Sequence, residues 1–209
     1  GNEMIGKFVA GNDFNYVQAH ATSIAASGKY NISSCSSEVI TSGRVQMKNY
    51  QAVDLINGLE RHDGYTHTFF KSFTPALQNS IRQYASQGGR ILISGSYTGS
   101  DMQTEEEQAF LSDILKLSYE PTGSTAITRD INPEDSTVTE RDSIVYTSPN
   151  VKGLGLQFSY YNELNAQHYA ATHPEILKPV GNYAFTAMQY DTGTSAAVAY
   201  KSTTYRSFV

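Results

Sequence analysis

The chain of 209 residues has little charge, one cysteine and no tryptophan. A single thiol, Cys35, excludes an internal disulfide and any cysteine-rich zinc or iron–sulfur site. The longest apolar runs are far shorter than the roughly 18 residues of a membrane-spanning helix, so the sequence predicts no transmembrane segment. The net charge is −5, and lysine and arginine form no run, which argues against a nucleic-acid partner. An anionic polymer would need a basic cluster that the linear sequence does not contain.

The length of the chain fits one domain. Gly1 in place of methionine, and an end at Val209 within an expected strand, predict that the chain is a piece of a longer protein. Residues 1–117 are expected to form a strand–helix core. Residues 118–209 are expected to form a β-rich extension that completes the sheet.

Strand and helix signals alternate in the first half of the chain. Residues 7–10, 30–33 and 52–56 are short runs that predict strands. Between the first two, apolar residues recur at helical spacing over residues 17–25. This spacing predicts a helix that ends at Gly28.

Two further helices have clear start signals. Thr74 can cap a helix that has Pro75 in its first turn, and a pair of glycines ends that helix. Residues 90–94 follow as the strongest predicted strand. Thr104 and Glu107 have the spacing of a capping box at the start of the third helix.

This order of elements predicts an α/β fold with a doubly wound, mostly parallel sheet and helices on both faces. In the second half, added strands are expected to extend the sheet or to form a lobe beside it. Their expected ranges are 144–146, 156–161, 184–190, 195–200 and 205–209. Residues 191–194 predict a hairpin turn between two of these strands.

Ligands of an open parallel sheet bind beyond the carboxyl ends of its strands. The loops expected at that edge are residues 11–15, 58–67 and 95–101. They contain the candidate ligand-binding residues Asn12, Asp13, Glu60, Ser96, Tyr97, Thr98 and Asp101.

The third loop has the form of a nucleophile elbow, Gly95-Ser96-Tyr97-Thr98-Gly99. In that motif a serine or cysteine occupies the apex above the sheet. Here the apex is Tyr97, and a phenol, with a pKa of about 10, does not perform acyl transfer as a thiolate does. Ser96 lies one residue away from the apex. The elbow therefore predicts no acyl-transfer chemistry.

Other chemistries have weaker signals. The elbow loop could cradle a phosphate, but Asp13 after the first strand would repel one. His62 and His67 are five residues apart in a loop, so no helix face holds them as metal ligands. The acidic residues 105–107 are explained by the favourable dipole at a helix start. The sequence therefore predicts neither a cofactor nor a metal.

Seven segments resemble a domain of large secreted proteins of Bacteroidetes. They are residues 11–16 (GNDFNY), 53–60 (VDLINGLE), 73–78 (FTPALQ), 88–97 (GGRILISGSY), 100–101 (SD), 161–165 (YNELN) and 197–201 (AVAYK). Members of that family are labelled xanthan lyases or N-acetylmuramoyl-alanine amidases and carry fibronectin type III or golvesin-like modules. The resemblance implies a class I glutamine amidotransferase-like, flavodoxin-like domain of a secreted, cell-surface or periplasmic protein. Active amidotransferases have a cysteine where this chain has Tyr97, so their catalysis does not carry over.

The preferred hypothesis is an accessory, non-catalytic domain of a polysaccharide- or peptidoglycan-processing protein, with carbohydrate or peptidoglycan and the other modules of the same chain as its partners. The rival is a polysaccharide lyase or amidase with its site around Tyr97. Its candidate catalytic residues are Tyr97, Ser96, Glu60, Asp101 and His67, with Arg61 or Lys71 to neutralise a substrate carboxylate. A third hypothesis is a plain sugar-binding module in which tyrosines such as Tyr65 and Tyr97 stack on sugar rings.

Overall fold

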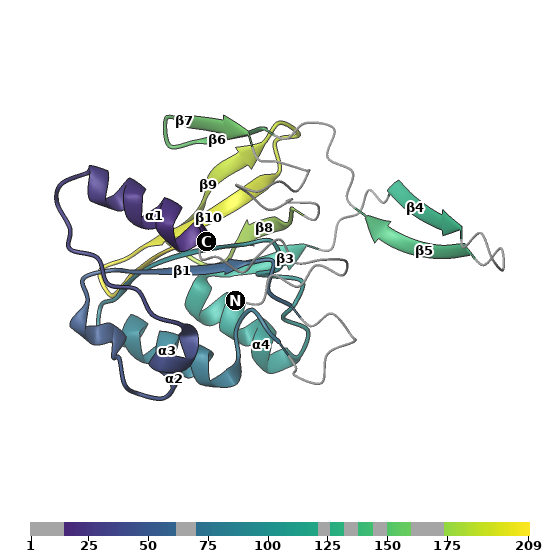
Figure 1. Cartoon of the computed structure of the whole chain (residues 1–209). Helices are drawn as coiled ribbons and strands as arrows, with labels where there is room; N and C mark the ends of the chain where they lie inside the picture. The colour runs from purple at the N-terminus through teal and green to yellow at the C-terminus, as the bar shows by residue number, and fades with distance from the viewer. Residues whose placement is uncertain (1–14, 62–69, 121–125, 132–137, 144–149, 160–173) are drawn as a thin grey trace.

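The computed structural model describes residues 15–61, 70–120, 126–131, 138–143, 150–159 and 174–209 (Figure 1). The helices are α1 (Asn15–Ala26), α2 (Ser37–Thr41), η1 (Met47–Asn49, a 3-10 turn), α3 (Pro75–Ser86), α4 (Glu105–Phe110) and η2 (Leu111–Leu115), which continues α4 as a π-type turn. The strands are β1 (Val53–Gly58), β2 (Arg90–Gly95), β3 (Leu117–Glu120), β4 (Ala126–Ile131), β5 (Val138–Ser143), β6 (Asn150–Gly153), β7 (Leu156–Ser159), β8 (Ile176–Pro179), β9 (Ala184–Tyr190), β10 (Ser195–Lys201) and β11 (Arg206–Phe208).

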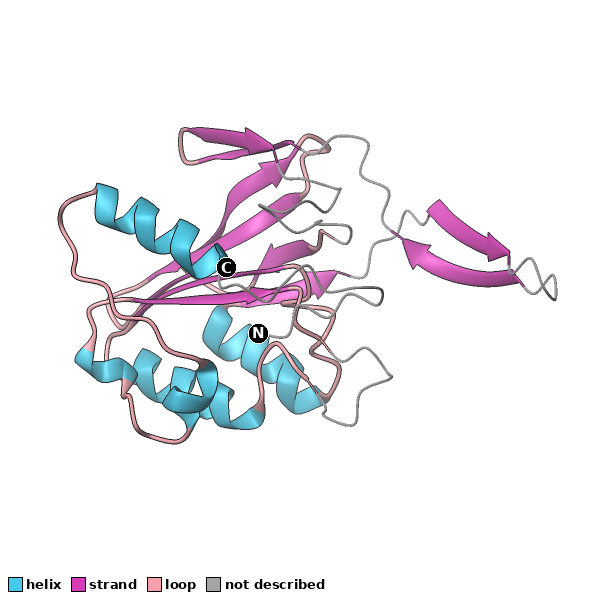
Figure 2. Ribbon diagram, in the orientation of Figure 1, coloured by secondary structure: helices cyan, strands magenta, loops and turns pink. Residues whose placement is uncertain are grey.

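The main sheet is mixed, which corrects the predicted fold class. Its strand order is β1-β2-β11-β10-β9-β6-β7. β1, β2 and β11 run parallel, whereas β10, β9, β6 and β7 pair with their neighbours in antiparallel fashion. The sheet curls from one end to the other instead of forming a flat layer between two layers of helices (Figures 1 and 2). The expectation of a doubly wound, mostly parallel, flavodoxin-like sheet is therefore wrong.

The helices are distributed unevenly over the two faces of this sheet. α2, α3 and α4 lie below it in Figure 2, and among the described helices only α1 lies on the other side. A doubly wound sheet requires crossover helices on both faces. Here the antiparallel pairs β6–β7, β9–β10 and β10–β11 are joined by hairpins, which need no crossover helix, and a second, smaller cluster of buried apolar residues lies on the side of α1.

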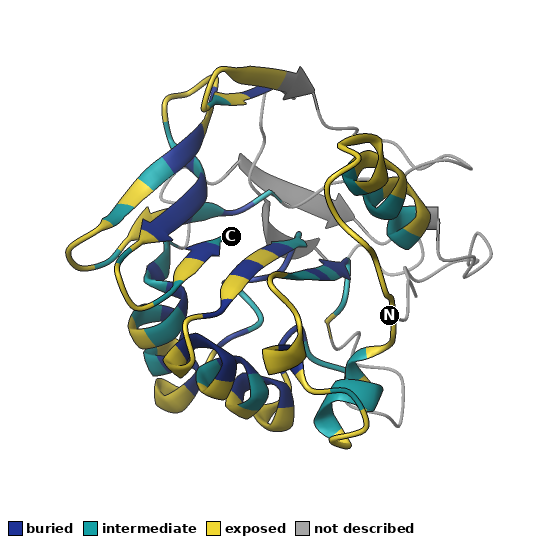
Figure 3. Cartoon of the chain, turned by 90° about the vertical axis from the view of Figure 1, so that its left-hand side faces the viewer, coloured by how far each residue is buried: buried dark blue, intermediate teal, exposed yellow. Residues whose placement is uncertain are grey.

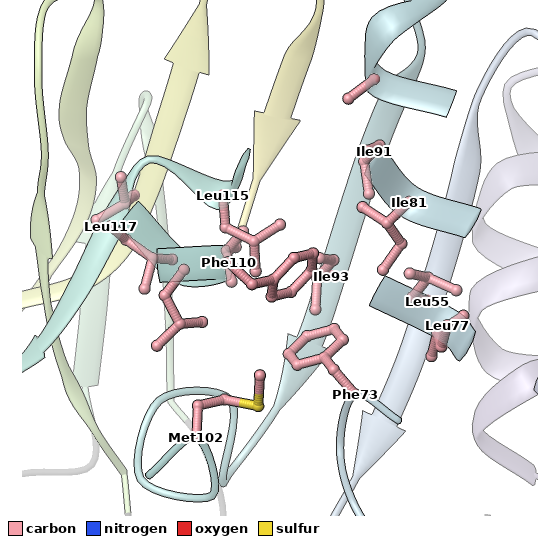
Figure 4. Close-up of a cluster of buried hydrophobic side chains, with 14 of the residues drawn as sticks. Leu55, Phe73, Leu77, Ile81, Ile91, Ile93, Met102, Phe110, Leu115 and Leu117 are labelled. Atoms are coloured by element: carbon pink, nitrogen blue, oxygen red, sulfur yellow. The ribbon is translucent and has the colours of Figure 1, made fainter. Parts of the chain in front are cut away.

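Large apolar side chains fill the space between the sheet and α3, α4 and η2 (Figure 4). Phe73 and Phe110 pack with their ring centroids 5.4 Å apart and their planes tilted by 54°. Ile81 from α3 and Leu115 from η2 are fully buried in the same cluster. This cluster fixes α3 and α4 against β1 and β2, and so fixes the loops that leave the carboxyl ends of those strands.

Several expected elements are confirmed. Thr74 caps α3 by accepting from the Leu77 amide at 3.3 Å, with Pro75 in the first turn. Thr104 and Glu107 form the expected capping box of α4. The expected hairpin turn at residues 191–194 joins β9 to β10.

Other expectations are wrong or lie outside the described residues. Residues 30–33 form no strand and are exposed. The strands expected at 7–10 and 144–146 lie outside the residues that the structure describes. No helix in the described part of the chain has the length and hydropathy needed to cross a membrane.

One polar contact holds α1 against β1. His20 Nδ1 lies 2.7 Å from Asp54 Oδ2, and this hydrogen bond raises the pKa of His20 above its usual 6.5, against the lowering effect of burial. A raised histidine pKa means that the contact stabilises the fold fully below pH 6.5 and loses this effect as the pH rises through the folded-state value.

Because His20 is about one-third exposed, screening by water limits the stabilisation to less than about 1 kcal/mol. We expect His20→Gln to destabilise the chain at pH 6 and to have a smaller effect at pH 8.5, measured by urea unfolding at the two pH values. Ser23→Ala, an exposed change on the same helix, is the control. A loss that is the same at both pH values would contradict the ionic nature of the contact.

Candidate functional site

The loops that follow β1 and β2 lie together at the carboxyl end of the parallel strands. The amide of Ser96 donates to the carbonyl oxygen of Gly58 at 2.8 Å. The hydroxyl of Ser72, which is 1% exposed, donates to the carbonyl oxygen of Glu60 at 2.8 Å and lies 3.2 Å from that of Tyr97. The structure therefore brings Glu60, Ser96 and Tyr97 into one region, as the elbow hypothesis requires.

The elbow itself is covered by the protein. Ser96, Tyr97 and Thr98 are 7%, 9% and 2% exposed. The guanidinium of Arg61 lies over the Tyr97 ring, 4.3 Å from its centroid, in cation–π geometry. A nucleophile elbow normally presents its apex side chain to a substrate. Here the apex ring packs inside the protein under an arginine, an arrangement typical of a structural tyrosine.

The backbone of the same loop binds a carboxylate that comes from the chain itself. The amides of Gly99 and Ser100 donate to Glu175 Oε2 and Oε1 at 2.6 and 2.9 Å, and the Ser100 hydroxyl also donates to Oε1. Two successive amides that face one anion form a backbone nest. Glu175 is 8% exposed, and burial raises its pKa although these donors act in the opposite direction. The Tyr190 hydroxyl donates to the carbonyl oxygen of Glu175 at 2.9 Å.

A second carboxylate closes the loop from the other side. Asp101 Oδ2 accepts from the Ser72 amide at 2.8 Å, and burial raises the pKa of Asp101. Lys71 Nζ donates to the Asp101 carbonyl oxygen and pairs with Glu107 Oε1, both at 2.6 Å. Burial acts to raise the pKa of Glu107, but Lys71 and the amides of the α4 cap lower it below its ordinary value. The ammonium of Lys71 is thus engaged with groups of this protein.

Glu60 and Asn57 are the less constrained polar groups of this region. Glu60 is half-buried, and burial raises the pKa of its carboxyl group, with the nearby negative charge of Asp101 adding a smaller effect. Asn57 is 9% exposed, and its Nδ2 has no hydrogen-bond partner among the residues that the structure describes. A Cβ added at Gly95 would lie 2.9 Å from the Asn57 Cβ, so the two strand ends pack too closely for a side chain at position 95.

Most of the remaining candidate residues from the sequence lie outside the part of the chain that the structure describes. Asn12, Asp13, His62, Tyr65 and His67 lie outside the described residues. Cys35 is an exposed free cysteine in the segment between α1 and α2, away from the elbow in sequence. The described residues contain no group of three or more histidine, cysteine, aspartate or glutamate side chains arranged to hold a metal ion.

Sequence reasoning missed Glu175 and Ser72. Glu175 is 75 residues away in sequence from Ser100, whose amide it accepts, and Ser72 lies just before α3. Neither belongs to a motif with fixed spacing. The one available signal was chemical: a loop with several unpaired amides and hydroxyls requires acceptors, and a buried carboxylate is the strongest acceptor a protein offers.

Comparisons with known proteins add no assignment. No protein-family model matches the chain, and no curated protein or solved structure matches it.

Proposed function

We propose that this chain is a non-catalytic, accessory domain of a secreted protein that processes polysaccharide or peptidoglycan, and that it acts by binding carbohydrate. The proposal that the domain is non-catalytic is supported by the closure of the elbow. Two amides of the elbow loop, those of Gly99 and Ser100, are occupied by Glu175, and the apex ring is buried under Arg61. The carbohydrate part is an expectation from the family resemblance.

The rival function is that of a lyase or amidase. The observation that favours it is the group of carboxylates with raised pKa values, Glu60, Asp101 and Glu175, near the end of β2, because such groups often serve as general acids. Two of the three accept backbone amides within this loop system, which is the geometry of structural carboxylates. We therefore prefer the binding role.

Tyr97→Phe and Ser96→Ala test the two roles. The chain and both variants are assayed for release of unsaturated sugar from polyuronates and of peptide from muropeptides, with binding to the same substrates followed by calorimetry. We expect binding without turnover, and equal binding by Tyr97→Phe. Turnover that either variant abolishes, with its folding unchanged by circular dichroism, would establish the enzyme. A lack of binding to every sugar would overturn the carbohydrate role.

A further inference from the structure

Three basic side chains lie side by side at the end of the sheet opposite the elbow. Arg90 begins β2, Arg206 begins β11 and Lys201 ends β10. In the strand register Arg206 is paired with both Arg90 and Lys201, so the three residues occupy neighbouring positions on one face. All three are exposed, and within the described residues no carboxylate forms an ion pair with them. We refer to Arg90, Arg206 and Lys201 as the basic row.

This row supplies the basic cluster that the linear sequence lacks. The three residues come from positions far apart in the chain, and strand pairing alone assembles them. Neighbouring strands are about 4.8 Å apart, so the outer two positions are separated by about 10 Å. Like charges in directly paired positions repel one another and destabilise a sheet. In a chain of net charge −5, three unpaired cations in register are therefore a costly arrangement that an anionic ligand would relieve.

An apolar row lies next to the basic row on the same face. Leu92 pairs with Phe208, Phe208 with Ala199, and Ala199 with Phe185, across four neighbouring strands. Leu92 is 38% and Phe185 44% exposed, although both lie within strands of the central sheet. Ala199 is 8% exposed and belongs with Phe208 to the second apolar cluster of this face, so the exposed members of the row are Leu92 and Phe185. Figure 3 views the molecule from the side that carries the turn between β10 and β11, and exposed and buried stretches alternate along the strands there.

Tyr183 adds an exposed aromatic ring at the edge of this surface. Its carbonyl oxygen accepts from the amide of Lys201 at 3.1 Å, so it borders the basic row. The side chain is 71% exposed, and the backbone has φ of +68°, in the left-handed region that a bulky residue seldom adopts. Residues in this region occur in tight turns, such as the one between β8 and β9 that contains Tyr183, and are also found more often at ligand-binding positions.

We propose that the basic row, the apolar row and Tyr183 form a binding surface for a carboxylated polysaccharide. The basic row would pair with carboxylates that recur along the polymer, and Tyr183 and the apolar row would contact the apolar faces of its rings. The exposed members of the two rows are spread over four neighbouring strands, β2, β11, β10 and β9, which suits an extended chain. This proposal rests on the carbohydrate-binding function proposed above and specifies its ligand class and its location, away from the elbow.

The test uses the whole chain and measures affinity by calorimetry for three probes: oligogalacturonate, the same oligomer with methyl-esterified carboxyls, and single-stranded DNA of similar charge. Arg90→Gln/Arg206→Gln/Lys201→Gln is compared with Arg44→Gln/Lys48→Gln/Lys152→Gln, which makes the same change in net charge at exposed positions elsewhere. Circular dichroism verifies that both variants fold. A fourth variant, Tyr183→Ala, tests the aromatic contact.

We expect the acidic oligomer to bind in preference to its methyl ester. The basic-row variant should bind at least about 10-fold more weakly, and its affinity should depend less steeply on salt concentration, because each lost cation removes one ion pair with a carboxylate of the polymer. The control variant should bind like the parent chain. Equal binding of acid and ester, unchanged in the basic-row variant, would overturn this surface and leave carbohydrate binding intact. Binding to no sugar would overturn both proposals, and equal affinity for DNA would show a general polyanion surface instead.

Discussion

Glu175→Ala is expected to lower the free energy of unfolding by about 3 kcal/mol. The substitution leaves the amides of Gly99 and Ser100 without their acceptor in a buried loop. Each buried donor left unsatisfied costs about 1 to 3 kcal/mol. The measurement is urea unfolding followed by circular dichroism, with Glu106→Ala, an exposed change on α4, as the control. A loss no larger than that of the control would show that Glu175 does not hold the loop.

Glu175→Gln distinguishes the effect of the negative charge from that of the oxygen that accepts the hydrogen bonds. Burial raises the pKa of Glu175, so the folded chain binds this proton more tightly than the unfolded chain. The charged form therefore costs stability above the folded-state pKa, and this cost disappears as the pH falls toward the unfolded value of 4.5. Glutamine keeps an acceptor oxygen but does not titrate. We expect Glu175→Gln to be closer to the parent chain than Glu175→Ala is, and its stability relative to the parent to fall as the pH is lowered.

Phe110→Ala is expected to lower the free energy of unfolding by about 4 kcal/mol. The Phe110 ring is fully buried against Phe73 and anchors α4 and η2 under the sheet (Figure 4). Its removal loses the apolar burial and leaves a cavity that this packed layer cannot close.

Chemical denaturation measures the effect of Phe110→Ala, and Leu156→Ala is the control. Leu156 is 63% exposed on β7, so its truncation should change stability by less than about 0.5 kcal/mol. Similar effects of the two substitutions would contradict the location of the core between the sheet and α4.

The sequence contained enough information for the local elements of the first half. Helix caps act over three or four residues, so Thr74 and Thr104 could be identified without knowledge of the fold. The apolar run at 90–94 was sufficient to predict β2. The segment at 30–33 was misassigned because its alternation is short and no neighbouring strand covers it.

The arrangement of the sheet could not be predicted in the same way. A short apolar run predicts a strand but not its direction, and only the hairpin turn at 191–194 indicated that β9 and β10 are antiparallel. The closed elbow and the basic row could not be predicted for the same reason. Glu175 reaches the elbow, and Arg206 lies between Arg90 and Lys201, only through tertiary pairing.

Glu175 closes the elbow loop, and amide hydrogen exchange at Gly99 and Ser100 measures this closure. Nitrogen-15 spectra of the parent chain and of Glu175→Ala would give the exchange rates of these two amides, with Leu92, in the middle of β2, as the internal reference. We predict slow exchange of both amides in the parent chain and exchange at least about 100-fold faster in the variant, with the reference unchanged. Fast exchange at Gly99 and Ser100 in the parent chain would show that the loop is open and that Glu175 does not close it.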